Sequence, residues 1–266
     1  MKKTFQLIAT ALTITGLIAC NENTEKEVTK DVTPNVAVQE LEMPVKSILT
    51  AEDQADMSPS EIIGRLKKGN ENFMNNNLTR RDHSAQRVEA MLGQYPKAIV
   101  LSCVDSRVPV EDVFDLGIGD IFVARVAGNI ENEDMVGSME FATAVAGSKV
   151  VIVMGHTSCG AVKSSIDKVD AKSLNMNSLA ALLTKIEPSM NGVETDGERK
   201  SSNVQFTNDV IEKNAIRTVQ DIRDASPVMA QMEVRGEIII VSAVYDMETG
   251  KVTFHDHNDR NGNHSL

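Results

Sequence analysis

The chain has 266 residues, 41% of them hydrophobic and 24% charged, which suits one globular domain with a full core. Its formal net charge of −11 argues against a nucleic-acid phosphate backbone as partner, and its 3% aromatic content without Trp argues against stacking on single-stranded bases. The acidic balance indicates a soluble surface and does not name a function.

The first segment has the layout of a secretory signal. Two lysines near the start precede an apolar stretch, residues 5–18, that is too short for a comfortable membrane span. The small residue Ala19 stands directly before Cys20, which resembles a bacterial lipobox, where cleavage leaves Cys20 as a lipid-bearing N-terminus. The alternative is an ordinary signal peptide followed by a chance cysteine. We therefore expect residues 1–19 to be a signal peptide and the protein to be exported and lipid-anchored to a bacterial membrane, on its periplasmic or cell-surface side.

A polar, acidic segment follows at residues 20–57. It shows no sustained helical or strand period, which predicts a flexible tether between anchor and domain. Ser58 then begins a helix-start signal, with Pro59 in the first turn and a glutamate at the third position. We therefore place the folded domain at residues 58–266 and its first helix over residues 60–76.

Strands and helices alternate through this domain. Four apolar runs predict buried strands, at residues 97–103, 120–127, 149–156 and 237–246. Helical patterns cover residues 84–92, 133–146, 160–167, 178–186 and 203–224. The alternation predicts an α/β fold whose mainly parallel central sheet, of four parallel strands plus a short C-terminal strand, is flanked by helices. Ligands bind such sheets at the carboxyl ends of strands, so a site is expected there.

Two of the three cysteines and one histidine follow predicted strands. Cys103 ends the first strand, whereas His156 ends the third and Cys159 lies just beyond it. If these strands are neighbours, two thiolates and an imidazole can bind Zn²⁺ tetrahedrally with one position open, as catalytic zinc sites do. A disulfide, the usual expectation in an exported protein, and inert buried thiols both stay open on spacing alone.

An acidic and a basic residue follow Cys103 closely. The stretch "CVDSR" places Asp105 and Arg107 two and four positions after the cysteine. A charge-assisted hydrogen bond between them would keep the carboxylate ionised and oriented toward water at the zinc, whereas a released Asp105 could itself take the fourth zinc position. Considered alone, the pair could equally be a surface salt bridge contributing about 0–1 kcal/mol.

"CVDSR" followed by "GHTSCGAV" resembles the signature of the β-class carbonic anhydrases, and the likeness covers roughly residues 62–254. The resemblance implies a zinc lyase in which Cys103, His156 and Cys159 bind one Zn²⁺ per subunit and Asp105 and Arg107 form a catalytic dyad. The implied reaction is the reversible hydration of carbon dioxide to bicarbonate and a proton. Hydroxide generated at the zinc attacks carbon dioxide, and the dyad orients that hydroxide.

The resemblance also implies an assembly and a regulatory difference. Family members pair as dimers, so we expect a homodimer or a dimer of dimers in which the helix over residues 60–76 wraps across the partner. Some members bind inhibitory bicarbonate with a tryptophan that Val100 replaces here, so Arg125 would be the remnant of such a site and we expect no such regulation.

Two alternative functions stay open on the same fold and zinc site. One is a hydrolase for carbon disulfide or carbonyl sulfide, which would use the same residues and differ in access to the pocket. The other is a catalytically silent zinc-binding lipoprotein. The intact Asp105 and Arg107 count against the silent protein, because a structural zinc site needs neither residue.

Overall fold

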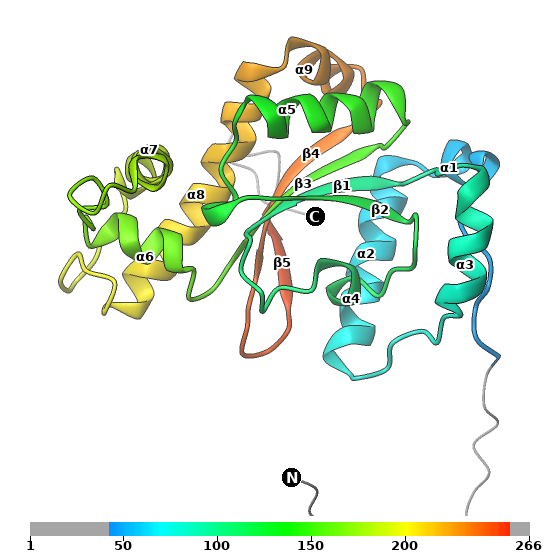
Figure 1. Ribbon diagram of the computed structural model, residues 1–266, viewed down its shortest axis with the longest axis horizontal. Helices are drawn as coiled ribbons and strands as arrows, with labels where there is room; N and C mark the ends of the chain where they lie inside the picture. Colours follow the sequence, from blue (N-terminus) through cyan, green and yellow to red (C-terminus); the bar gives the residue numbers. More distant parts are fainter. Residues whose placement is uncertain (1–42, 256–266) are drawn as a thin grey trace, which may run out of the picture. The chain divides into compact units, whose positions relative to one another are not determined.

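A five-stranded sheet forms the centre of the computed structural model, which describes residues 43–255 (Figure 1). Its strands are β1 Ala98–Ser102, β2 Ile121–Arg125, β3 Val150–His156, β4 Ile239–Tyr245 and β5 Val252–His255. Their order is β2-β1-β3-β4-β5, with β1 to β4 parallel and β5 antiparallel to β4. This confirms the predicted α/β fold with four parallel strands and a short C-terminal strand.

The helices flank this sheet. They are α1 Ala51–Asp56, α2 Pro59–Met74, α3 His83–Glu89, α4 Val110–Val113, α5 Glu133–Glu140, α6 Gly160–Ile166, α7 Asn177–Ile186, α8 Val204–Ala225 and α9 Pro227–Val234. The described residues also form three short 3₁₀ helices and one π-helical segment: η1 Ala90–Leu92, η2 Ala127–Asn129, η4 Glu187–Met190 and the π-helical η3 Phe141–Val145. Within residues 43–255, no helix combines the length and the apolar character needed to cross a bilayer.

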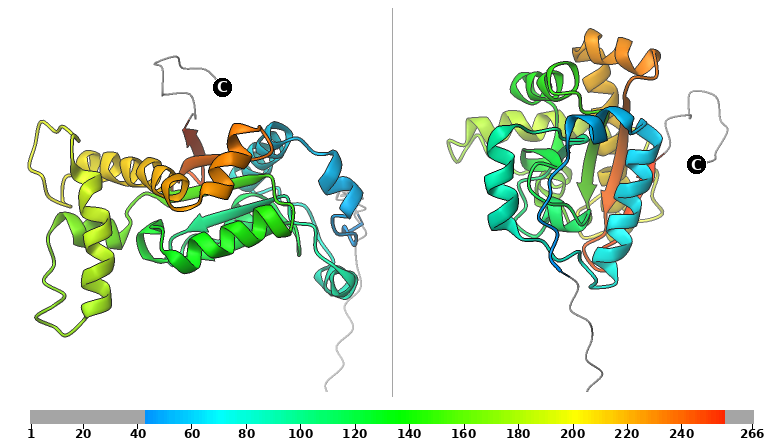
Figure 2. Two further views of the ribbon diagram at one scale, coloured as in Figure 1. Left: turned by 90° about the horizontal axis from the view of Figure 1, so that it is seen from above. Right: turned by 90° about the vertical axis from the view of Figure 1, so that its right-hand side faces the viewer.

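Side chains alternate between two cores on the two faces of the sheet. On β1, Val100 packs on one face in a core shared with α2 and α4, whereas Ile99 and Leu101 pack on the other with α5, α8 and α9. The helices of the two cores lie on opposite sides of the strands (Figures 1 and 2). Because both faces are covered, the inner strands β1 and β3 are buried along their whole length, as their continuous apolar runs predict.

The helix α2 begins where its sequence signal predicts. Ser58 is the N-cap: its hydroxyl accepts from the Glu61 amide at 3.3 Å, and the Glu61 carboxylate accepts from the Ser58 amide at 2.8 Å. This reciprocal capping box satisfies two backbone donors that the first helical turn would otherwise leave free. The helix then runs to Met74, close to the predicted end.

The folded part of the chain begins before Ser58. Helix α1 lies inside the segment predicted as tether, and its Gln54 side-chain amide donates to the carbonyl oxygens of Pro96 and Ala146 at 2.8 and 2.9 Å. The flexible-tether prediction therefore does not hold over residues 43–57. The segment is bound through polar bonds to backbone carbonyls, which its hydrophobic pattern cannot reveal. Cys20, the predicted signal peptide and residues 20–42 of the predicted tether lie outside the described residues.

Other elements also differ from the sequence expectation, among them α4, which was not predicted. The predicted helix over residues 133–146 divides into α5 and the π-helical turn η3. Beyond α8, the helix α9 was not predicted, although Ser226 caps it through the Met229 amide and Pro227 stands at its first position. Ser226 also ends α8, so one residue is both the C-cap of α8 and the N-cap of α9. The sequence pattern at this position indicates only the end of a helix.

Candidate metal centre

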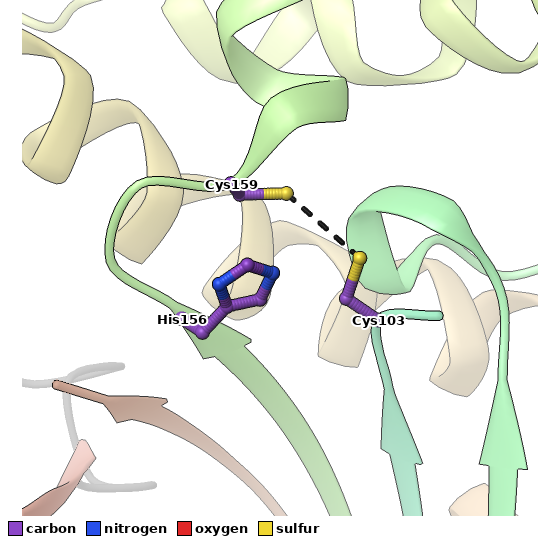
Figure 3. A group of neighbouring side chains, drawn as sticks. All are labelled: Cys103, His156 and Cys159. Carbon is purple, nitrogen blue, oxygen red and sulfur yellow. Dashed lines mark hydrogen bonds between the residues drawn. The ribbon is translucent and has the colours of Figure 1, made fainter. Parts of the chain in front are cut away.

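The three predicted ligands meet at the carboxyl end of the sheet. Strands β1 and β3 are direct neighbours, with Ser102 paired to Met154, so Cys103 and His156 emerge at the same rim. Cys159 is the N-cap of α6 and faces them across the short β3–α6 turn (Figure 3). The donor atoms of the three side chains all lie within 4.8 Å of one another. The condition set by the sequence, that the two strands be adjacent, is therefore met.

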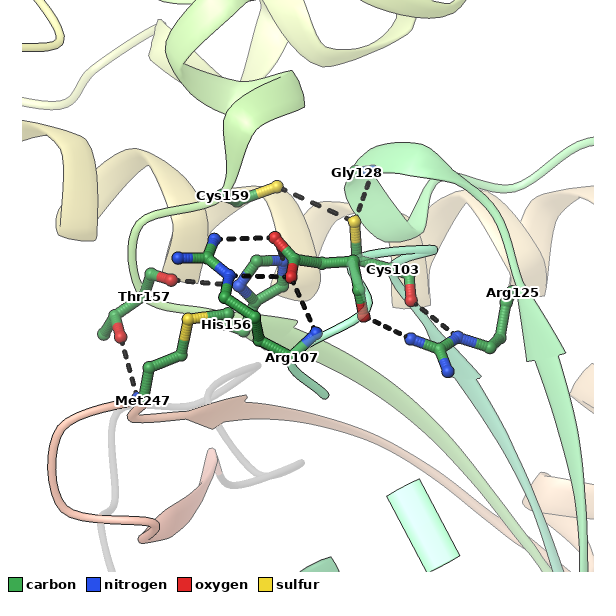
Figure 4. Close-up of polar contacts among 9 residues, drawn as sticks. Cys103, Arg107, Arg125, Gly128, His156, Thr157, Cys159 and Met247 are labelled. Carbon is green, nitrogen blue, oxygen red and sulfur yellow. Dashed lines mark hydrogen bonds and ion pairs between the residues drawn. The ribbon is translucent and has the colours of Figure 1, made fainter. Parts of the chain in front are cut away.

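The imidazole of His156 is held in the tautomer that a metal requires. Its Nδ1 lies 2.9 Å from the carbonyl oxygen of Thr157, and because a carbonyl only accepts, Nδ1 carries the proton (Figure 4). Thr157 is fixed in turn, since its hydroxyl accepts from the Met247 amide at 3.0 Å. The other ring nitrogen, Nε2, is buried and has no hydrogen-bond partner among the described residues. A buried ring nitrogen that has no hydrogen-bond partner and lies beside two sulfurs is placed as a metal ligand would be.

The two sulfurs lie within hydrogen-bond distance of each other and are not joined in a disulfide. They lie 4.0 Å apart, well beyond the bond length of about 2.0 Å in a disulfide. The hydrogen bond from Cys159 lowers the pKa of Cys103 to about 4, with further help from the backbone amide of Gly128, which lies 3.4 Å from the sulfur. Next to this thiolate, and buried, the Cys159 thiol has a raised pKa. A divalent cation bound by both sulfurs must therefore displace the Cys159 proton.

The donor set fits Zn²⁺. Two thiolates and one imidazole are soft and borderline ligands, which Mg²⁺ and Ca²⁺ do not use. All three side chains are almost fully buried, with exposed fractions of 4% for Cys103 and 0% for His156 and Cys159. Three protein ligands leave one tetrahedral position for water or substrate, which is the arrangement of catalytic zinc.

Asp105 is clamped beside this centre. Both of its oxygens are bound by Arg107, with Nε to Oδ1 at 2.9 Å and Nη2 to Oδ2 at 2.7 Å, and the Arg107 backbone amide adds a third bond to Oδ1 at 3.0 Å. These hydrogen bonds hold the pKa of Asp105 far below its usual range, so the carboxylate is ionised. Its Oδ2 lies 3.9 Å from Nε2 of His156. The pair is therefore part of the centre and not an isolated surface salt bridge.

Arg125 holds the backbone of the same loop. Its Nε donates to the Cys103 carbonyl at 2.9 Å and its Nη2 to the Asp105 carbonyl at 2.5 Å (Figure 4). The residue lies at the end of β2, paired in register with Ser102, which explains how it reaches this loop. The sequence interpretation, a remnant of an inhibitory bicarbonate site, missed this role. It also assigned no role to Gly128 or Thr157, although "RVAGN" stands at a strand end as the predicted ligands do.

Comparisons with known proteins agree with this geometry. Residues 98–252 match the family model described as carbonic anhydrase. Carbonic anhydrase 2 of Mycobacterium tuberculosis is 30% identical over 196 residues, covering 72% of this chain and 90% of that protein. The carbonic anhydrase of Mycolicibacterium smegmatis is 29% identical over 198 residues, covering 72% and 91%. Among solved structures, the β-carbonic anhydrase CafA of Aspergillus fumigatus aligns with a TM-score of 0.55 at 22% identity, covering 74% of this chain and 90% of that one. The chain belongs to the β-class carbonic anhydrase family.

Proposed function

We propose that this protein is a zinc-dependent carbonic anhydrase that catalyses the reversible hydration of carbon dioxide to bicarbonate and a proton. The observation that carries the proposal is the convergence of two thiols and an unpaired imidazole nitrogen within 4.8 Å, beside an ionised carboxylate clamped by arginine. Bound by Cys103, His156 and Cys159, Zn²⁺ supplies Lewis acidity that makes water ionise near neutral pH.

The dyad orients the attacking oxygen. Among the described residues, Oδ1 of Asp105 accepts two hydrogen bonds, from the backbone amide and Nε of Arg107, whereas Oδ2 accepts one. Oδ2 is also the oxygen nearer to His156, at 3.9 Å from Nε2. Its remaining lone pair is therefore free to accept the proton of the attacking water or hydroxide in a hydrogen bond, which turns the oxygen lone pair toward carbon dioxide.

Arg107 would keep Asp105 away from a metal bound by the three ligands. A carboxylate this close to the ligands could itself bind the metal if it turned toward it. The fork of Arg107 binds both carboxylate oxygens and holds Asp105 in the orientation that accepts a hydrogen bond. Arg125 stabilises the loop that carries Asp105, because it donates hydrogen bonds to the backbone carbonyls of Cys103 and Asp105.

Oxygen exchange tests this function directly. The zinc-loaded protein is mixed with ¹⁸O-labelled bicarbonate at chemical equilibrium, and the loss of label from carbon dioxide is followed by mass spectrometry. We expect rapid loss of label, and a loss at the buffer rate in Asp105→Asn. A folded, zinc-loaded protein that exchanges label only at the buffer rate would contradict the proposal and favour the sulfur-substrate hydrolase or the silent binding protein.

We also infer that the protein forms a homodimer through the edge of the sheet. Strand β2 pairs only with β1 among the described residues, and its residues 121–123 are partly exposed. Phe141 packs against Phe122 of this strand, with ring centroids 6.0 Å apart, and is 50% exposed. Apolar surface beside an unpaired strand edge supports association with a second copy. Light scattering of the purified protein should give twice the subunit mass, or four times that mass for a dimer of dimers, and a monomer at micromolar concentration would contradict the inference.

We further propose that the protein is exported and anchored by a lipid on Cys20, after removal of residues 1–19. The support is the sequence pattern alone, with the acidic segment up to residue 42 as the tether between anchor and domain. In a bacterial host, the protein should partition with membranes and its N-terminal peptide should carry the mass of a lipidated cysteine. Cys20→Ser should release it into the soluble fraction. A wild-type protein without lipid on Cys20 would contradict the anchor.

A further inference from the structure

A buried chain of hydrogen bonds leads from the turn η4 through a side chain of helix α8 to the metal centre. The Ser189 hydroxyl, in η4, donates to Oδ1 of Asn214 at 3.0 Å, and Nδ2 of Asn214 donates to the Gly128 carbonyl at 2.8 Å. The Gly128 amide in turn donates to Sγ of Cys103 at 3.4 Å (Figure 4). Ser189 and Asn214 are buried, with exposed fractions of 0% and 1%. The mechanism uses neither side chain.

The turn at Gly128 has a conformation that needs support. Gly128 has φ +72° and the next residue, Asn129, has φ +44°, so two successive residues lie in the left-handed region. A Cβ atom on Gly128 would come within 2.6 Å of Cδ1 of Ile186, which excludes any larger residue without rearrangement. Glycine has the widest backbone freedom, so this turn keeps its shape only where other groups fix it. The bond from Asn214 to the Gly128 carbonyl fixes one of the two peptide groups that flank the glycine α-carbon.

The other flanking peptide group carries the N–H that points at Cys103. Rotation about the backbone bonds of Gly128 would move this N–H relative to the carbonyl, so anchoring the carbonyl also restrains the N–H···S bond. Asparagine suits the position for a chemical reason. Its Oδ1 accepts from the Ser189 hydroxyl, which leaves Nδ2 to donate to the Gly128 carbonyl. Aspartate has no donor for that carbonyl.

The N–H···S bond matters to a metal bound by two thiolates. Two thiolates neutralise the charge of Zn²⁺ and weaken it as a Lewis acid. An amide that donates to one sulfur withdraws electron density from it and so restores part of that acidity, while it also fixes the sulfur in place. We propose that Asn214 is a positioning residue for the metal centre: through the Gly128 amide it sets the donor strength and the placement of the Cys103 thiolate. The proposal rests on the metal site of the proposed function but not on the reaction.

Cobalt substitution allows the Cys103 thiolate to be followed by absorption spectroscopy. In the Co²⁺-loaded protein, absorption from thiolate-to-cobalt charge transfer reports the energy of the sulfur lone pairs, which a hydrogen bond lowers. In Asn214→Ala we expect this band to move to longer wavelength, because the Gly128 amide is no longer held against the sulfur. The affinity for Zn²⁺, measured by competition with a chelator, should fall by about 10-fold or more.

Asn70→Ala is the matched control. Asn70 is also a buried asparagine, 3% exposed, whose Nδ2 donates to the carbonyls of Val113 and Gly250 at 3.1 and 2.8 Å. Its loss should destabilise the fold, but it should leave the cobalt band and the Zn²⁺ affinity at their wild-type values. An unchanged band and affinity in Asn214→Ala, or an equal change in both variants, would overturn the proposal.

A milder variant decides the question if Asn214→Ala does not fold. Ser189→Ala removes only the anchor of Asn214, and it should move the band in the same direction by a smaller amount. An unchanged band in Ser189→Ala would then count against the proposal. Because spectrum and affinity are measured without carbon dioxide, a failure of catalysis leaves the result intact. A wild-type protein that binds neither Co²⁺ nor Zn²⁺ would contradict the metal site and the inference with it.

Discussion

Replacing Arg107 by glutamine should lower activity without removing the metal. The variant loses both side-chain bonds to Asp105, Nε to Oδ1 and Nη2 to Oδ2, but it keeps the backbone bond to Oδ1. Oδ2 thus loses its hydrogen bond from Nη2 of Arg107, at a position 3.9 Å from Nε2 of His156. Asp105 can then turn toward the fourth metal position, or lose the orientation that accepts a hydrogen bond from the attacking oxygen.

The size of the effect follows from these contacts. Hydrogen bonds between charged groups contribute about 1.5–3 kcal/mol each when they are buried. The side chain of Arg107 is 58% exposed, so screening by solvent weakens both bonds well below this value. Arg107 restrains Asp105 and does not itself accept the proton, so we expect kcat/KM to fall by about 10-fold, less than the roughly 10²- to 10⁴-fold that losing a positioned proton acceptor costs. Arg107→Lys keeps the positive charge but not the two-pronged guanidinium, so its kcat/KM should lie between those of the wild type and Arg107→Gln.

The assay is stopped-flow hydration of carbon dioxide by proteins of equal zinc content. Arg235→Gln is the matched control, because Arg235 binds Glu237 with the same fork, at 2.6 and 2.8 Å, and the same spacing of two residues. That pair lies just before β4, at the end of the strand opposite to the metal centre, and its loss should leave kcat/KM unchanged. Activity in Arg107→Gln equal to that of the control would refute the role assigned to the clamp.

Three further outcomes follow from the described contacts. Asp115 is buried and bound to Arg81 at 2.6 Å, so Asp115→Asn should cost about 3–5 kcal/mol in urea unfolding; a loss below 1 kcal/mol would contradict this. Burial alone would raise the pKa of Asp115, but its hydrogen bonds, from Arg81 first, hold it below its ordinary value. Its contribution is therefore complete above about pH 5 and is lost as the pH falls through the native pKa, so the difference between wild type and variant should shrink in acid; a constant difference would contradict this. Aerobic removal of the metal should produce a Cys103–Cys159 disulfide, since the sulfurs are 4.0 Å apart, whereas lasting titration of two free thiols would count against it.

The strands and the metal ligands are predictable because their signals are local. Buried strands such as β3 appear as short apolar runs, and a parallel sheet brings their carboxyl ends to one rim. Once "CVDSR" and "GHTSCGAV" are placed at two such ends, Cys103, His156 and Cys159 can meet only if β1 and β3 are adjacent. Spacing left a disulfide and inert thiols open beside zinc, and the resemblance to a family decided in favour of zinc.

The supporting contacts are not predictable from the sequence because they join distant positions. Asn214 lies 86 residues from Gly128, in the middle of an amphipathic helix, where it looks like an ordinary polar position. Arg125 reaches its carbonyl partners only because β2 pairs with β1 in register. Gln54 binds α1 to the domain through two backbone carbonyls, in a segment whose composition predicts a flexible chain. Each of these contacts depends on tertiary structure and leaves no periodic pattern.

The most direct test of the zinc carbonic anhydrase is stopped-flow hydration of carbon dioxide at pH 8.5, with the zinc-loaded wild type and Cys159→Ser side by side. The account predicts rapid hydration by the wild type, with one zinc bound per subunit, and hydration at the buffer rate by Cys159→Ser, which loses one of three metal ligands. A folded wild type that binds zinc and does not exceed the buffer rate would contradict the central claim, and so would full activity in Cys159→Ser.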